Sequence, residues 1–358
     1  MAILNEEEYL RKAMKIWGMH PEYIDFNLKS RQGIKGLEKL YSKYNGKPTE
    51  LIFDENGRLD IDKMGYVETA VGVSGTAKLA KWILHPDLST GIIKRGMEYS
   101  NHIKDSNEKE KIGKKCRYTT LTAMAIADLM GQDVARYYIV KEKNESDQNL
   151  PRIYTPNFLK NNEELFSFLN ISDDSNIMYK FRGNGMFVDI DTEIQKLEYF
   201  LYSRRFPSEQ IEQVKKDFIK QCIVSKICNN KDEAKRNIGI VVSNNNKENK
   251  IERNVKMAPM YDLENCFIPE VCIWEREVGG DKSLKGVIDK YTKLDWCNDW
   301  LKKAIKNINN LDQVYDRVKQ MSNIEVPEEY RKIFNEQIIQ NINIVNAELE
   351  REEENIEK

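Results

Sequence analysis

Hydrophobic and polar residues follow different patterns in the two halves of the chain. Between residues 51 and 160 the apolar residues come in short runs separated by glycines and polar turns, which predicts strands. The dipeptide Asn56-Gly57 separates two such runs and predicts a β-hairpin. One apolar helix, 121–130, interrupts the strands, and Gly131 is predicted to cap its C-terminus. The strand-rich stretches are 51–61, 67–94, 135–143 and 152–159.

The second half carries apolar residues at helical spacing over longer stretches. A loop-and-strand hairpin, 229–265, separates its helices, and the asparagine-rich segment 244–250 is predicted to form the hairpin tip. Ser208 is the predicted N-cap of the helix that follows it. The polar stretch 99–117 is expected to be a surface loop or a surface helix. The predicted helices are 193–205, 208–228, 296–308, 311–321 and 327–350, with two short ones near the N-terminus at 6–17 and 33–44.

These patterns predict an α+β fold with two lobes, a β-rich N-terminal lobe and a mainly helical C-terminal lobe. A chain of 358 residues is long enough for one large bilobal domain with a substantial core. The expected parts are a helical and hairpin extension packed on the first lobe (1–65), a β-rich lobe (66–160), a helical lobe (161–350) and a charged tail (351–358).

Composition narrows the classes of function. Lys and Arg number 56 against 58 Asp and Glu, and this balance gives no global basic field, so direct nucleic-acid binding is not expected. The six cysteines form no C-x-x-C pair and only three histidines are present, which argues for reduced thiols and against zinc. No stretch approaches the ~20 apolar residues that span a bilayer, and the acidic N-terminus is not a signal peptide. We therefore expect a cytoplasmic protein without a membrane partner.

The hairpin between the helices carries the strongest chemical signal. Asp232 precedes Asn237 by five residues, directly before an apolar run, and Asp262 follows a second strand-like run. Carboxylate and amide oxygens suit Mg²⁺, and phosphoryl transfer needs such metal ligands together with a base that orients the acceptor hydroxyl. An Asp-Asn pair alone is more typical of a solvated turn, so its interpretation as a metal site depends on Asp262.

A second set of residues in the β-rich lobe could bind phosphate. Small residues between two apolar runs would let backbone N–H groups approach phosphate oxygens. Lys94 follows two β-branched residues in a predicted strand, as the phosphate-binding lysine of a V-A-I-K strand does. The residues of the small, glycine-containing segment are Gly72, Ser74, Gly75, Thr76 and Lys78.

Together these motifs resemble the HipA-like family of bacterial serine/threonine kinases, particularly its small stand-alone members. The likeness rests on the run Gly72–Lys78, on Ile93-Lys94, on Asn230-Lys231-Asp232 with Asn237, and on Ala258-Pro259-Met260-Tyr261-Asp262. The likeness covers about residues 67–265, and its motifs follow one another in the family's order. It implies a bilobal protein-kinase-like fold in which the first lobe binds ATP and the hairpin residues hold Mg²⁺.

The resemblance also implies a role for each residue. Asp232 would be the catalytic base, Asn237 and Asp262 the Mg²⁺ ligands, and Lys94 a phosphate ligand. The substrate would be serine or threonine of a protein, with a toxin-like activity held by an antitoxin-like regulator. In some relatives the phosphate loop autophosphorylates, which would involve Ser74 or Thr76, and a phosphoryl group there would repel ATP.

The sequence departs from the family pattern at two places. Glu233-Ala234 follows the base where the family has Arg-His, and Thr120 stands where the family has the glutamate that pairs with the strand lysine. The partner of Lys94 therefore stays open, with Glu98 as one candidate.

Three other functions remain open on the same fold. A pseudokinase would bind ATP and signal without turnover, and the two departures favour it. A lipid kinase would need a basic membrane-facing patch, for which 113–117 is a weak candidate. A nucleotidyltransferase would transfer the nucleotide instead of the phosphoryl group. The protein substrate, the role of the first 65 residues and the oligomeric state are not predicted.

Overall fold

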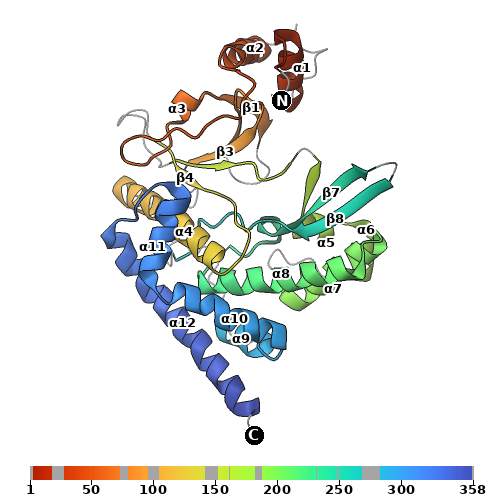
Figure 1. Ribbon diagram of the computed structural model, residues 1–358, viewed down its shortest axis with the longest axis vertical. Helices are drawn as coiled ribbons and strands as arrows, with labels where there is room; N and C mark the ends of the chain where they lie inside the picture. The colour runs from red at the N-terminus through yellow and green to blue at the C-terminus, as the bar shows by residue number, and fades with distance from the viewer. Residues whose placement is uncertain are drawn as a thin grey trace. The chain divides into compact units, whose positions relative to one another are not determined.

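The computed structural model describes residues 3–17, 28–72, 80–95, 105–141, 152–160, 162–181, 188–230, 232–247, 250–267 and 283–356. They belong to two compact units, whose helices and strands are labelled in Figure 1, and each unit has its own core. The first unit comprises Met1–Arg117, Arg136–Asn157 and Lys319–Ile324, and the second comprises Tyr118–Ala135, Phe158–Val318 and Glu325–Lys358. Within the described ranges, every helix is too short or too polar to span a bilayer.

An antiparallel sheet of five strands forms the centre of the first unit, in the order β1-β2-β3-β5-β4. The predicted strands are confirmed, although two of them are shorter than the apolar runs that predicted them. The strands are β1 (Val67–Gly72), β2 (Ala80–Leu84), β3 (Thr90–Arg95), β4 (Tyr138–Ile139) and β5 (Arg152–Pro156).

Neighbouring residues of β2 show that the two faces of this sheet are covered by different segments. Leu84 packs with Tyr9 and Leu37 of the helices α1 (Glu6–Trp17) and α2 (Leu28–Tyr41). Ile83 packs instead with the cluster that contains Leu59. Successive side chains of a strand point to opposite faces, so the helical pair covers one face and the segment around Leu59 covers the other.

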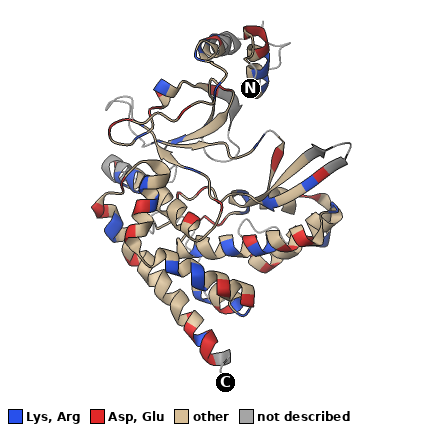
Figure 2. Cartoon of the chain, viewed as in Figure 1, with Lys and Arg blue, Asp and Glu red and all other residues tan. Residues whose placement is uncertain are grey.

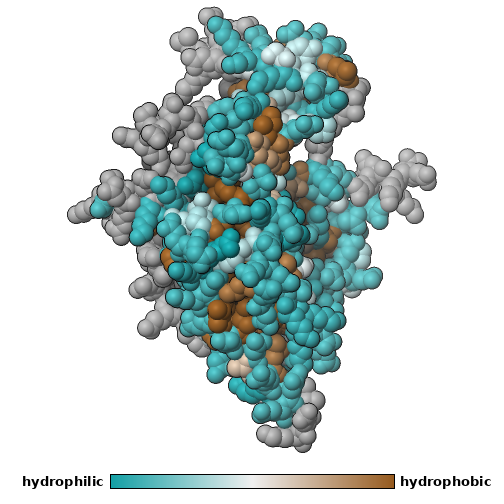
Figure 3. Space-filling view, turned by 60° about the vertical axis from the view of Figure 1, so that its left-hand side comes forward, coloured by the Kyte–Doolittle hydropathy of each residue, from teal (hydrophilic) through white to brown (hydrophobic). Residues whose placement is uncertain are grey.

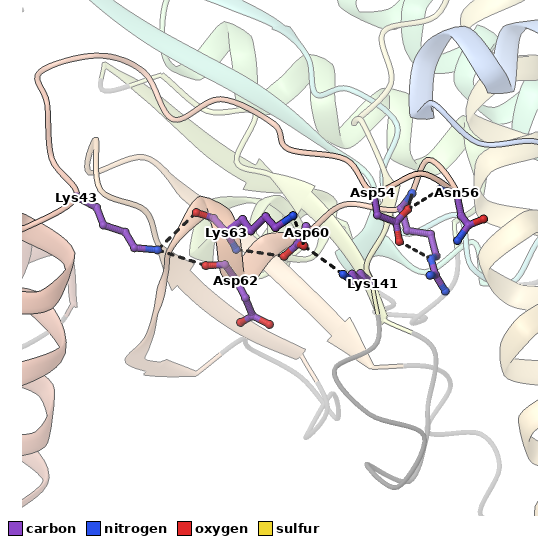
Figure 4. Close-up of polar contacts among 8 residues, drawn as sticks. Lys43, Asp54, Asn56, Asp60, Asp62, Lys63 and Lys141 are labelled. Carbon is purple, nitrogen blue, oxygen red and sulfur yellow. Dashed lines mark hydrogen bonds and ion pairs between the residues drawn. The ribbon is translucent and has the colours of Figure 1, made fainter.

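The predicted Asn56-Gly57 hairpin is a tight reversal with one bridging pair, Phe53 and Leu59. Asp54 stabilises the turn by accepting the Asn56 and Arg58 N–H groups at 3.0 and 2.8 Å (Figure 4). Gly57 has a φ of 75°, a left-handed conformation that favours glycine. The chain then turns into the short helix α3 (Ile61–Met64), which Asp60 caps, so the second apolar run becomes core and helix rather than a long strand.

A three-stranded antiparallel sheet, β6-β7-β8, and most of the helices form the second unit. No hydrophobic pattern in the sequence predicted β6. The strands are β6 (Glu163–Ser167), β7 (Gly239–Lys247) and β8 (Lys250–Met257). The helices are the end of α4 (Ser106–Leu129), α5 (Phe168–Ser172), α6 (Ser175–Lys180), α7 (Ile190–Ser203), α8 (Ser208–Ile227), the 3-10 turn η3 (Lys235–Asn237), α9 (Leu284–Tyr291), α10 (Asp295–Ile308), most of α11 (Leu311–Ser322) and α12 (Glu328–Ile356).

Most helix predictions are confirmed to within a few residues, with instructive differences. The N-cap of α8 is Pro207 rather than Ser208, since the helix begins at Ser208 itself and no side chain caps it. The asparagine-rich segment 244–250 contains the end of the β7–β8 hairpin, as predicted, but residues 244–247 are paired strand, because β7 extends to Lys247 and pairs there with Lys250. Part of the expected charged tail is helical, as α12 continues through Ile356.

Aromatic and branched side chains from helices and sheet form the core of the second unit. Phe168 and Phe218 meet edge to face with ring centroids 4.7 Å apart, and both are fully buried with Phe200. Ile240 of β7 and Met257 of β8 belong to the same cluster, so the sheet packs on α7 and α8. Charged residues occur along both helices (Figure 2), and the surface in view is mostly hydrophilic (Figure 3).

Candidate active site

The end of α8 sets the start of the loop that carries Asp232. Asn229 adopts a left-handed conformation with a φ of 50°, which asparagine tolerates better than most residues and which ends the helix. The Asn230 N–H then donates to Ser225 O at 2.9 Å, and the Asn230 side-chain oxygen accepts the Asp232 N–H at 3.0 Å. Two consecutive asparagines therefore turn the chain and place Asp232 just beyond the helix. We call residues 229–237 the catalytic loop, after the role that the family resemblance implies for Asp232.

The five-residue spacing of Asp232 and Asn237 closes into a compact turn. The Asn237 N–H donates to Ala234 O at 2.9 Å, and its side-chain amide donates to the backbone oxygen of Asp232 at 3.2 Å. The chain then enters β7 at Gly239. A Cβ at Gly239 would lie 2.6 Å from Phe166 O on β6, so only glycine allows the two strands to approach so closely.

Asp262 lies on a second loop, residues 258–267, that leaves β8. Met260 anchors this loop through a parallel bridge to Val134, just after the end of α4. The Met260 N–H donates to Asp133 O at 2.8 Å, and Met260 O accepts the Ala135 N–H at 2.9 Å. Asp262 itself has a φ of 60°, a left-handed conformation that costs energy for a residue with a side chain. Backbone strain of this kind is common at functional sites.

The two loops meet at the Asp232 carboxylate. Its Oδ2 accepts the Asn265 side-chain amide at 3.4 Å and lies 3.5 Å from the Arg236 guanidinium. The Tyr261 hydroxyl links the loops again by donating to Arg236 O at 2.8 Å. Burial raises the pKa of Asp232, the negative charge of Asp262 raises it further, and Arg236 partly opposes both effects. The site thus holds two carboxylates whose negative charges repel each other.

These residues fit a magnesium site of the kind that kinases use. Among the residues that the structure describes, no three His, Cys, Asp or Glu side chains form a metal cage. Mg²⁺ commonly takes only one or two protein carboxylates and completes its shell with water and substrate phosphates. A divalent cation would relieve the repulsion that raises the pKa of Asp232.

The first departure from the family pattern is accommodated locally. Glu233 turns its carboxylate to α8, where Oε2 lies 2.7 Å from Lys226 Nζ. The added negative charge beside Asp232 is therefore paired with a cation. The second departure, Thr120, is fully buried in α4.

The expected phosphate-binding residues are described only in part. Lys94 is half-buried on β3, where its backbone pairs with Ala80 on one side and Ile153 on the other. Gly72 ends β1. The remaining candidates lie outside the described residues: Ser74, Gly75, Thr76, Lys78 and Glu98.

Sequence reasoning missed two amide side chains that organise the site. Asn265 holds the Asp232 carboxylate, as described above. Gln337 of α12 accepts the Asn229 side-chain amide at 2.9 Å and donates to Phe267 O at 3.1 Å, so it ties the ends of both loops to one helix. Neither residue belongs to a local motif. The position of Asn265 three residues after Asp262 is the one signal that could have marked it.

Comparison with known proteins supports the fold and little more. No protein-family model matches the chain, and no curated protein matches it. It is similar to the Helicobacter pylori proinflammatory kinase CtkA, with a TM-score of 0.52 and 12% identity over 76% of this chain and 94% of that one. It is also similar to HipA of Shewanella oneidensis MR-1, solved with HipB and operator DNA, with a TM-score of 0.44 and 13% identity over 88% of this chain and 70% of that one. The CtkA likeness shows that this chain has a kinase-like α+β fold.

Proposed function

We propose that this protein is an ATP-dependent kinase of the HipA-like type that transfers the γ-phosphoryl group to serine or threonine of a protein. The observation that carries the proposal is the meeting of two loops at Asp232, with Asn237 on one loop and Asp262 on the other. In a kinase-like fold this arrangement supplies the base and the hard oxygen ligands that phosphoryl transfer requires.

Each residue has a defined task in this proposal. Asp232 accepts the proton of the attacking hydroxyl as the oxygen bonds to phosphorus and ADP leaves. Its raised pKa makes it a better proton acceptor than an exposed aspartate. Asn237 and Asp262 would hold Mg²⁺, which neutralises charge on the phosphates, and the family resemblance gives Lys94 the role of a phosphate ligand. Autophosphorylation at Ser74 or Thr76 and an antitoxin-like regulator remain proposals from the family resemblance.

A pseudokinase is the second candidate, and the buried Thr120 favours it. A threonine cannot pair with a lysine as the family's glutamate does, and this weakens the expected hold on Lys94. The ion pair of Glu233 with Lys226 argues against a damaged catalytic loop.

The deciding experiment incubates the purified protein with Mg-ATP and measures intact mass and phosphopeptides, with Asp262→Ala as control. Phosphate on serine or threonine, absent in the control, would support the kinase. Saturating Mg-ATP should also stabilise the protein by about 2.7 kcal/mol at a hundred times its Kd. Stabilisation without phosphate on the protein or on added protein acceptors would support the pseudokinase, and a nucleotide-sized mass gain would indicate nucleotidyl transfer.

A further inference from the structure

A cluster of buried charges lies on the inner side of the catalytic loop. It joins Lys235 of η3 to Glu193 and Lys196 of α7, and these three side chains are 3%, 1% and 1% exposed. Glu193 Oε1 accepts from Lys235 Nζ at 2.7 Å and from Lys196 Nζ at 3.3 Å. The hydroxyl of Ser172, at the end of α5, lies 3.5 Å from both ammonium groups.

The inward position of Lys235 needs a physical reason. Lysine is almost never fully buried without a partner, because removing its charge from water costs several kcal/mol. The next residue, Arg236, shows the ordinary behaviour of a cation on a loop, with a side chain that is 42% exposed. Lys235 is drawn inward by Glu193, and that ion pair connects the middle of the catalytic loop to α7.

The charge balance of the cluster indicates that the two lysines have different roles. Two ammonium groups share one carboxylate, and Lys196 forms with Glu193 an i,i+3 pair that belongs entirely to α7. Without Lys235, Glu193 would still have a cationic partner, and the buried charges would balance. Lys235 is therefore not needed to neutralise Glu193, which leaves its effect on the loop as the reason for its place.

We propose that Lys235 is a positioning residue for phosphoryl transfer, which fixes the turn between Asp232 and Asn237 by its ion pair with Glu193. Lys235 lies three residues after the base and two before the amide, so the pair holds the loop between its two functional residues. A loop released from α7 would let the distance between base and metal ligand vary, and small displacements of reacting groups reduce turnover strongly. This inference rests on the kinase function proposed above.

The test compares Lys235→Met with Lys196→Met, since each variant removes one of the two cations that share Glu193. Lys235→Met should lower kcat at least ten-fold and raise the Mg²⁺ concentration for half-maximal activity, while its Tm stays within a few degrees of the parent. Lys196→Met should leave kcat within about three-fold. Lys235→Arg, which keeps a cation on the loop, should recover part of the lost turnover.

A second measurement does not depend on activity. Amide hydrogen exchange at the Asn237 N–H, which donates to Ala234 O, should be at least ten-fold faster in Lys235→Met than in Lys196→Met. Equal exchange in the two variants, or equal losses of kcat, would overturn the positioning role. A wild-type protein that neither transfers phosphate nor binds Mg-ATP would refute the proposed function, and the exchange comparison would still decide whether Lys235 holds the loop.

Discussion

At the scale of single residues, the surroundings of Asp232 lower the stability of the folded protein and make its carboxylate a stronger base. Its folded-state pKa is raised, first by burial and then by Asp262, so the ionised carboxylate is less stable in the folded protein than in the unfolded chain. The stability linked to Asp232 is present below its unfolded pKa and is lost as the pH rises through its folded pKa. At neutral pH the ionised side chain therefore costs stability.

Asp232→Asn should abolish phosphoryl transfer and raise Tm at pH 7 by about 2–4 °C, the shift that ~1 kcal/mol produces in a large domain. The gain should be smaller at a lower pH such as pH 4, because protonation of the parent carboxyl removes the charge that opposes folding. Calorimetry at the two pH values measures both effects, with the exposed Asp299→Asn as control. A lower Tm for Asp232→Asn at pH 7 would show that the ionised carboxylate stabilises the fold.

Arg236 adjusts the same carboxylate in the opposite direction. Its guanidinium lowers the pKa of Asp232, against the effects of burial and Asp262. Arg236→Gln should therefore move the acid limb of the pH–kcat profile to higher pH, because more of the base is protonated at a given pH. Arg236→Lys keeps a charge and should leave the limb near its original position. An acid limb that moves to lower pH in Arg236→Gln would contradict the assignment of Asp232 as base.

Residues of the site differ in how well the sequence predicts them. The Asp232–Asn237 turn can be recognised in the sequence because the residues that close it lie within one short segment. Asn265 reaches Asp232 across 33 residues, and Gln337 reaches Asn229 across 108. Such contacts exist only after the chain has folded, so no local sequence pattern predicts them. The ion pair of Lys235 with Glu193 on α7 is hidden from local patterns for the same reason.

At the scale of elements, hydrophobic periodicity predicted the regular helices well and failed where charges are buried. Helix α4 begins at Ser106, inside the polar stretch that was expected to be a loop or a surface helix. Lys115 and Arg117 are 6% and 7% exposed, so charged residues occupy part of the buried face and break the apolar pattern. Hydrophobic periodicity likewise does not reveal the Glu193–Lys196 pair on α7, because these buried residues are charged.

Two chemically identical Glu–Lys pairs lie on the neighbouring helices α7 and α8, and we expect them to differ sharply in their contribution to stability. Glu193→Gln would leave two buried lysines without a carboxylate and should lower the free energy of unfolding by about 3–5 kcal/mol. Glu212 and Lys215 form the same i,i+3 pair on α8 with Glu212 54% exposed, and Glu212→Gln should change stability by less than ~0.5 kcal/mol. Denaturant unfolding of both variants measures the difference. Similar values would show that Glu193 is hydrated rather than buried.

Two glycines make a second comparison between elements. Gly239→Ala would press a methyl group against the backbone of β6, at 2.6 Å from Phe166 O, and should cost roughly 1–3 kcal/mol. Gly131→Ala meets no atom within 4 Å, but its φ of 76° is strained for alanine, at a cost of about 1 kcal/mol. Because β7 follows the catalytic loop directly, Gly239→Ala should also reduce kcat, whereas Gly131→Ala should affect only stability. Thermal unfolding together with kcat would test this, and equal effects on kcat would contradict it.

At the scale of the whole molecule, the chain crosses between its two units several times. A change of pattern near residue 160 predicts one boundary between a β-rich part and a helical part. The second unit, however, also contains Tyr118–Ala135, and the first contains Lys319–Ile324. The end of α4 is apolar and looks like part of the strand-rich half in the sequence. Its place in the second unit follows from long-range contacts, which periodicity does not reveal.

The contacts of the segment Tyr118–Ala135, which contains the end of α4, indicate how the second unit depends on that helix. Asp128 forms an ion pair with Arg317 at 2.6 Å, and the Trp300 indole donates to Met130 O at 3.2 Å. Met260, beside Asp262, is bound to the segment after α4 by two backbone hydrogen bonds. A fragment of residues 158–358 loses all of these contacts and exposes the apolar surface that α4 covers, so it should unfold without a sharp transition and bind a hydrophobic dye.

A fragment of residues 106–358 restores α4 and should unfold more sharply, although it lacks β1, β2 and β3 of the first unit's sheet. Near- and far-ultraviolet circular dichroism during heating would compare the two fragments with the full chain. A sharp transition for 158–358 at the Tm of the full chain would show that the helical part folds alone. Loss of the sharp transition in 158–358 and its return in 106–358 would show that the loop carrying Asp262 depends on a helix encoded more than a hundred residues earlier. The β-rich half of the sequence would then contribute directly to the geometry of the acids.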